Sequence, residues 1–154
     1  MTVRDPIILR ALETEDTATL SQWYYDDRTG LEAVFGAVMP TEGDFIRKCN
    51  ELFELIKQYT ARILMVELRG DPIGFVLVTD IPVSLEMARA HIYLMPSKRR
   101  YALRVSEAGI TEATKMGIQR LIQTIRSDNA SGIKLGKRVG FVPSPIMTMV
   151  KELH

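Results

Sequence analysis

The sequence has one cysteine, two histidines and no long apolar run, and each scarcity excludes a class of protein. Cys49 is the single cysteine, so no internal disulfide can form, and two separated histidines with one cysteine do not make a usual zinc set. No apolar run approaches the ~18 residues that a membrane helix needs, and the first residues lack a secretory leader pattern. The sequence therefore predicts a cytoplasmic protein without a metal site or a membrane anchor.

The sequence also lacks a marked excess of positive or negative charge. Its 20 lysines and arginines are balanced by 19 aspartates and glutamates, which gives a net charge of +1. This balance, together with the lack of a nucleic-acid-binding motif, argues against a nucleic-acid partner. The 154 residues suffice for one domain with its own core, so we expect a single domain over residues 1–154. The sequence leaves open whether the chain acts alone or as a homodimer.

Apolar periodicity predicts an alternation of strands and helices along the chain. The expected strands are 7–10, 62–68, 73–80, 86–95, 118–125 and 146–153, and the expected helices are one capped by Asp16 plus 44–59, 105–116 and 131–139. The order is β-α-α-β-β-β-α-β-α-β. It predicts an α/β (α+β) three-layer sandwich, in which four helices cover a central mixed sheet of about six strands.

The segment that joins the strand 86–95 to the next helix is rich in cations and has no glycine. Lys98, Arg99, Arg100 and Arg104 lie within seven residues of one another. Because the overall charge is balanced, this local excess of positive charge indicates a local anion. The other interpretation is a solvated turn with surplus charge.

The strand 86–95 itself alternates between two kinds of side chain. Its even positions are small or apolar, while His91 and Tyr93 lie on the opposite face. Cys49 lies on the apolar stripe of the helix 44–59, which predicts a core thiol and not a catalytic one.

This order of elements, with a strand, a phosphate-loop-like turn and a helix at its middle, resembles the GNAT superfamily of acyl-CoA-dependent N-acyltransferases. The stretch "DNASGIKLGKRVGF" at 128–141 is similar to the family's second cofactor segment, with Asn129, Leu135, Gly140 and Phe141 in register. The stretch "RRYALR" at 99–104 corresponds to the family's pyrophosphate loop, Gln/Arg-x-x-Gly-x-Gly/Ala. Its first position is kept, and Ala102 and Arg104 stand where the family has small residues.

The resemblance implies transfer of an acetyl group from acetyl-CoA, as co-substrate, to a primary amine of a small molecule or protein, by direct attack in a ternary complex. It implies cofactor contacts at ten positions: Leu94, Met95, Lys98, Arg99, Arg100, Tyr101, Ala102, Leu103, Arg104 and Asn129. His91 falls where some members carry their general base, and the N–H of Leu94 or Met95 where the oxyanion is bound. The family's usual general acid is a tyrosine, and Gly136 stands at that position here. Tyr93 or Tyr101 could take over the role of the missing acid.

Residues 24–43 connect the first two expected helices and are long for a connection. In this fold the segment would overhang the acceptor site, and its acidic side chains could receive a cationic amine: Asp26, Asp27, Glu32 and Glu42. The alternative for this segment is a mobile polar loop.

The missing glycines and helix tyrosine support a rival interpretation, in which a GNAT-fold protein has lost catalysis and serves as a binding or structural part. Residues 97–104 and 129–140 are also similar to GNAT-like proteins of bacteriophages, including internal virion proteins. Cofactor binding separates the two interpretations.

Overall fold

The computed structural model describes residues 5–144, 149, 151 and 153, and these belong to two compact units that divide after Thr124. The first unit contains β1 (Ile7–Ala11), α1 (Asp16–Asp26), α2 (Arg28–Phe35), α3 (Glu42–Lys57), β2 (Arg62–Leu68), β3 (Asp71–Thr79), β4 (Ala88–Leu94), the 3-10 helix η1 (Pro96–Tyr101), α4 (Ala102–Lys115) and β5 (Leu121–Ile122). The second contains α5 (Ala130–Arg138).

The first unit is built on one mixed sheet with the order β1-β2-β3-β4-β5. The first four strands pair antiparallel, and β5 pairs parallel with β4. This confirms the predicted α/β architecture, with five strands in the described residues where about six were expected. The strand expected over 146–153 falls on a segment most of which lies outside the described residues.

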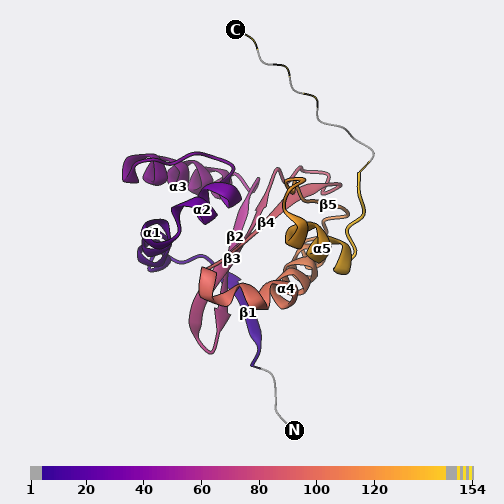
Figure 1. Ribbon diagram of the computed structural model, residues 1–154, viewed down its shortest axis with the longest axis horizontal. Coiled ribbons are helices and arrows are strands. Elements are labelled where there is room, and N and C mark those ends of the chain that lie inside the picture. The colour runs from indigo at the N-terminus through magenta and orange to yellow at the C-terminus, as the bar shows by residue number, and fades with distance from the viewer. Residues whose placement is uncertain (1–4, 145–148, 150, 152, 154) are drawn as a thin grey trace. The chain divides into compact units, whose positions relative to one another are not determined.

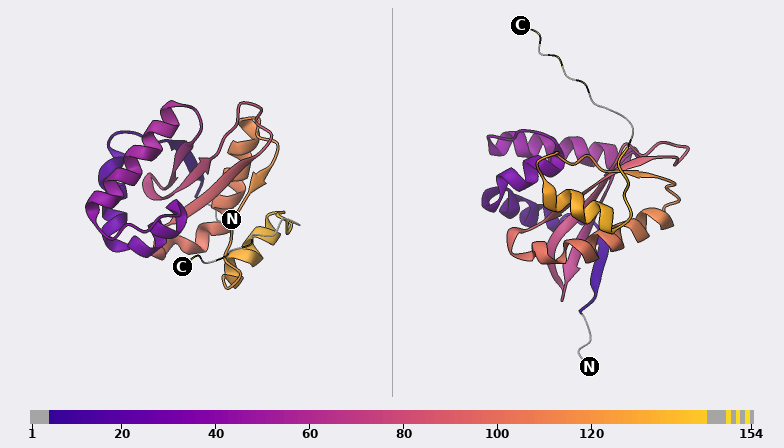
Figure 2. Two further views of the ribbon diagram at one scale, coloured as in Figure 1. Left: turned by 90° about the horizontal axis from the view of Figure 1, so that it is seen from above. Right: turned by 45° about the vertical axis from the view of Figure 1, so that its right-hand side comes forward.

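Two separate cores cover the two faces of this sheet, as strand alternation requires. Trp23, Phe75 and Tyr93 belong to the core beneath α1, α2 and α3, which we call the aromatic face. Val76 and Val105 belong to the core beneath α4, which we call the aliphatic face. Figure 1 shows the three N-terminal helices on one side of the strands and α4 on the other, and Figure 2 shows the same layers from two further directions.

The expected loop 24–43 is wrong, because the segment contains the helix α2. The Asp27 carboxylate caps this helix by accepting the Gly30 N–H at 3.3 Å. Leu31 and Phe35, four residues apart on one side of the helix, are both buried. Gly36 ends it in the left-handed region with a φ of 64°.

Two helix starts also differ from the prediction. Asp16 is the first residue of α1 and not its cap, and its carboxylate accepts the Glu13 N–H at 2.7 Å and pairs with Arg10. The helix α3 begins at Glu42 because Thr41 and Asp44 form a reciprocal capping box.

A hairpin joins the antiparallel strands β2 and β3. Its turn residues Arg69 and Gly70 have φ values of 55° and 81°, as a two-residue hairpin turn of positive φ requires. The predicted strand 118–125 is reduced to Leu121–Ile122.

Candidate functional site

The strand β4 has one edge that is only partly paired. Its register with β5 covers two residue pairs, Ala88 with Leu121 and Arg89 with Ile122. From residue 90 to Leu94, no strand in the part of the chain that the structure describes pairs with this edge. The pairing between β4 and β5 therefore ends before the C-terminal half of β4.

Main-chain groups along this edge can be assigned from two hydrogen bonds. The Ala88 N–H donates to Arg120 O at 3.0 Å, on the β5 side, whereas the Met95 N–H donates to Ile73 O at 3.0 Å, on the β3 side. Because successive residues of a strand direct their main-chain groups to opposite edges, the N–H and C=O of Ile92 and Leu94 face the β5 side. We call this stretch, residues 90–94 on the β5 side, the open edge.

Only one of the two predicted oxyanion donors, the N–H groups of Leu94 and Met95, faces the open edge. Leu94 directs its N–H to the open edge and remains a candidate. The N–H of Met95, the other alternative, is already bonded to Ile73 O.

The cationic segment after β4 is helical and not a loop. Pro96 opens η1, which continues directly into α4. The Lys98 N–H donates to Met95 O at 2.9 Å, and the Ala102 N–H donates to Arg99 O. These two main-chain donors are engaged within the chain, so side chains would supply the contacts to an anion at these positions.

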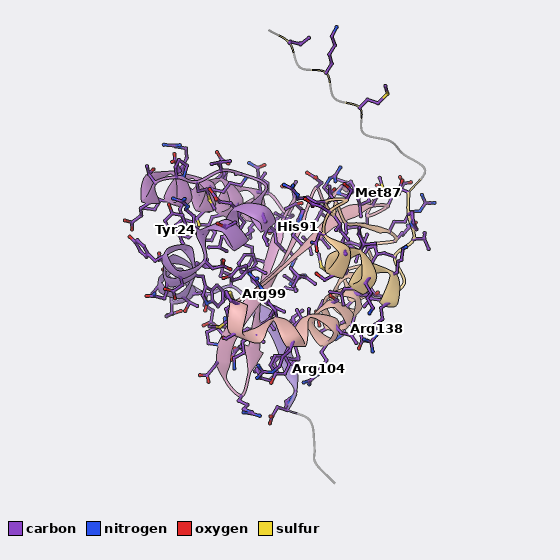
Figure 3. The ribbon with its side chains drawn as sticks, in the orientation of Figure 1. Tyr24, Met87, His91, Arg99, Arg104 and Arg138 are labelled. Carbon is purple, nitrogen blue, oxygen red and sulfur yellow. The ribbon has the colours of Figure 1, made fainter. Side chains whose placement is uncertain are left out.

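The arginines of this segment have different partners, and Figure 3 labels two of them, Arg99 and Arg104. Arg99 pairs with Asp27, with 3.1 Å between its Nη2 and Oδ2. Arg100 donates to Ser97 O at 3.1 Å and lies over the Tyr101 ring, 4.8 Å from its centroid. These two side chains stay on or beside η1.

Arg104 donates to the carbonyl oxygen of Asp5, which precedes β1. Because β1 is at the opposite end of the strand order from β5, Arg104 is directed away from the open edge. The predicted contact between Arg104 and the cofactor is therefore not supported by its position.

His91 is half-buried on β4, on the same strand face as Tyr93. Burial, reinforced by the nearby Arg89 cation, lowers the pKa of its imidazole below the ordinary 6.5. The side chain is therefore neutral at pH 7 and able to accept a proton.

Tyr93 is only 2% exposed, and its ring centroid lies 5.4 Å from that of Trp23 and 5.4 Å from that of Phe75. Its hydroxyl donates to Asp27 Oδ2 at 3.1 Å. Burial first, and the Asp27 charge next, raise the pKa of this hydroxyl, so Tyr93 retains its proton at neutral pH.

Asp27 is the residue whose position the sequence did not reveal. It had been one of four acidic residues in an expected loop, but its carboxylate contacts β4 through Tyr93 and η1 through Arg99. An aspartate before "RTG" is a helix-cap signal that could have located α2, although not these tertiary contacts.

Two further residues singled out in the sequence, Cys49 and Asn129, have contacts that are explained by packing and helix capping. Burial raises the pKa of the Cys49 thiol to about 11, which agrees with a core thiol. In the second unit, Asn129 caps α5, and its Oδ1 accepts the Gly132 N–H at 2.9 Å. Among the residues that the structure describes, no group of three or more histidine, cysteine or acidic side chains could hold a metal ion, and no helix is long and apolar enough to cross a membrane.

Comparison with known proteins places these features in one family. The model of the acetyltransferase (GNAT) domain matches residues 7–142. No curated protein matches the sequence.

Two solved structures with the same fold illustrate the likeness. Spermidine N-acetyltransferase from Vibrio cholerae, in complex with CoA and spermine, has a TM-score of 0.76 and 21% identity, over 90% of this chain and 82% of that one. The ribosomal L7/L12 alpha-N-protein acetyltransferase RimL, in its apo form, has a TM-score of 0.71 and 18% identity, over 89% of this chain and 77% of that one.

Proposed function

This chain belongs to the GNAT acetyltransferase family, and we propose that it transfers the acetyl group of acetyl-CoA to a primary amine of a small molecule or protein, by direct attack in a ternary complex. The observation that carries the proposal is the open edge of β4. The pantetheine arm of CoA contains two amides, and the N–H and C=O groups of Ile92 and Leu94 on the open edge are suitable partners for them. The similar enzyme from Vibrio cholerae was solved in complex with CoA.

His91 is the proposed general base. An alkylammonium has a pKa near ~10.4, so the acceptor must lose a proton before its nitrogen can attack. A neutral imidazole can take that proton directly or through a water. The lowered pKa of His91 keeps it in the neutral form down to a pH below 6.5.

The acyl transfer then proceeds through a tetrahedral intermediate. The amine nitrogen forms a bond to the thioester carbon, the carbonyl oxygen takes up negative charge, and the Leu94 N–H donates to it. Collapse of the intermediate re-forms the carbonyl and breaks the C–S bond, the amine nitrogen gives its remaining extra proton to solvent, and the CoA thiolate is released. Gly136 cannot protonate that thiolate, which is a tolerable leaving group with a pKa near ~8.5.

Cofactor binding is the first experimental test. A ligand at 100 times its Kd stabilises a folded protein by about 2.7 kcal/mol, so acetyl-CoA should raise the melting temperature clearly. An unchanged melting curve would favour the rival function, a binding or structural protein that has kept the fold and lost the catalysis.

Turnover is the second test, measured as thiol release from acetyl-CoA with a panel of primary amines. His91→Ala should lower kcat/KM by on the order of 10²–10⁴, because a positioned base contributes that much. Cys49→Ser serves as the control and should leave the rate unchanged, since its thiol is a packing group. An undiminished rate in His91→Ala would reject the base assignment.

A further inference from the structure

The Asp27 carboxylate lies where α2, β4 and η1 meet, and its three partners differ in exposure to solvent. Oδ1 accepts the Gly30 N–H, while Oδ2 accepts both the Tyr93 hydroxyl and Arg99 Nη2, each at 3.1 Å. The Asp27 side chain is 15% exposed, whereas that of Arg99 is 60% exposed. A nearly buried anion is therefore neutralised by a cation that lies mostly in solvent.

Asp27 is held in place by its surroundings, independently of Arg99. Tyr93 is fixed among aromatic rings. Gly30 leaves the space that the carboxylate fills, because a Cβ there would lie 2.2 Å from Oδ2. Arg99 is the one long, exposed partner of the three. Ion pairs with an exposed partner contribute little to stability, so Arg99 can leave while Asp27 stays.

The resemblance gives Arg99 a second anionic partner, the diphosphate of the cofactor, because Arg99 stands at the first position of the pyrophosphate-loop pattern. An arginine fork suits a diphosphate better than one oxygen of a carboxylate, because it can make parallel charge-assisted hydrogen bonds. The diphosphate of CoA and the Asp27 carboxylate would therefore compete for one guanidinium.

We propose that Arg99 exchanges between Asp27 and the cofactor's diphosphate, so that Asp27 becomes available to a cationic group of the acceptor only after the cofactor has bound. This rests on the proposed function and adds an order of binding to it. Once Arg99 leaves, the carboxylate is nearly buried without a cation, which is unfavourable until another cation arrives. Since coupling between two ligands is reciprocal, a bound cation also tightens cofactor binding.

The first experiment measures the Kd of CoA by isothermal titration calorimetry for the wild-type protein and Asp27→Asn. Asparagine keeps the helix cap and a hydrogen-bond partner for Tyr93 but removes the charge. We expect roughly two- to five-fold tighter CoA binding, because the competing ion pair is lost. Asp26→Asn is the matched control, since it makes the same charge change one residue away, where the carboxylate bonds Gln22 Nε2 at 3.0 Å.

Gly30→Ala distinguishes the loss of the Asp27–Arg99 contact from the loss of the Asp27 charge. The added methyl group displaces the Asp27 carboxylate and leaves the net charge unchanged. It should also tighten CoA binding, and the effects of both variants should vanish in an Arg99→Ala background. If Asp27→Asn and Asp26→Asn change the Kd equally, the exchange is overturned while the proposed function stands. If CoA binds none of these proteins, both are overturned.

The second experiment titrates 1,4-diaminobutane as the cationic probe, with and without saturating CoA. Binding should appear in the CoA-loaded protein, be at least several-fold weaker in the free protein, and be lost in Asp27→Asn. Equal binding with and without CoA, or no binding in either state, would overturn the assignment of Asp27 to the acceptor.

Discussion

The two faces of the sheet use different side chains, and only one of them carries the proposed chemistry. The aromatic face packs rings such as Trp23, Phe75 and Tyr93, and the Tyr93 hydroxyl reaches a carboxylate at the rim of that core. The aliphatic face packs branched side chains such as Val76 against α4. A tyrosine ring combines a large apolar body with a polar tip, so it can fill a core and still position an ionised group. The aliphatic face supports the strands that hold the site.

The largest expected effect compares neighbours on the two faces. Phe75 is fully buried and Val76 is 2% exposed. Phe75→Ala should lower the free energy of unfolding by about 3–5 kcal/mol, because it removes a whole ring, whereas Val76→Ala should lower it by roughly 2 kcal/mol. Urea unfolding measures both. An equal or larger loss in Val76→Ala would contradict the ranking of the two cores.

The next effect comes from Gly74, where β3 approaches β4 closely on the side opposite the open edge. A Cβ at Gly74 would lie 2.0 Å from Tyr93 O and 3.0 Å from Leu94 Cα. Gly74→Ala should therefore shift β4, lower the free energy of unfolding by about 1–3 kcal/mol, and weaken CoA binding. Urea unfolding and calorimetry test the two parts. Wild-type CoA affinity in a destabilised variant would show that the position of β4 matters less than proposed.

A second carboxylate, that of the buried Asp16, sharpens the comparison because it lies away from the open edge. Hydrogen bonds from Arg10 hold the pKa of Asp16 below its ordinary 3.8. A depressed folded-state pKa gives stability that is present above pH 3.8 and is lost as the pH falls through the folded value.

Asp16→Asn should lower the free energy of unfolding at pH 7 by about 1–3 kcal/mol and flatten its decline below pH 4. CoA affinity should stay unchanged, in contrast to Asp27→Asn. Unfolding curves between pH 2 and pH 7 test this, and an undiminished acid dependence would show that other groups control it.

The sequence predicted those features that depend on local pattern. The apolar pattern located the antiparallel strands β2, β3 and β4 to within two residues of their observed bounds. The helix α2 was missed because Gly30 within "RTG" is typical of a turn, whereas here glycine is needed beside the Asp27 carboxylate. The 3-10 helix was missed although Pro96 is a helix-start signal.

The candidate site was predictable only in part. His91 and Leu94 are close to the open edge because strand alternation is regular. The contacts of Asp27 join residues 66 and 72 positions apart, and so depend on how α2 and η1 pack. The direction of Arg104 toward Asp5 likewise depends on tertiary packing, which residue types do not specify.

The smallest effect is expected on the aliphatic face. Gly109 lies inside α4, where a Cβ would meet the two γ-carbons of Val76 at 3.5 and 3.6 Å, an ordinary contact distance. Gly109→Ala should raise the free energy of unfolding by about 0.5–1 kcal/mol, because glycine is unfavourable within a helix. A loss of stability in urea unfolding would show that this interface is packed more tightly than its distances indicate.

The open edge of β4 is tested most directly by hydrogen exchange of single amides, followed by NMR with and without CoA. The account predicts that the Ile92 and Leu94 N–H groups exchange more slowly when CoA is bound. Tyr93, whose N–H faces β3, should change little and serves as the internal control. Unchanged exchange at Leu94 with CoA bound, or equal slowing at Tyr93, would contradict the assignment of the open edge to the cofactor.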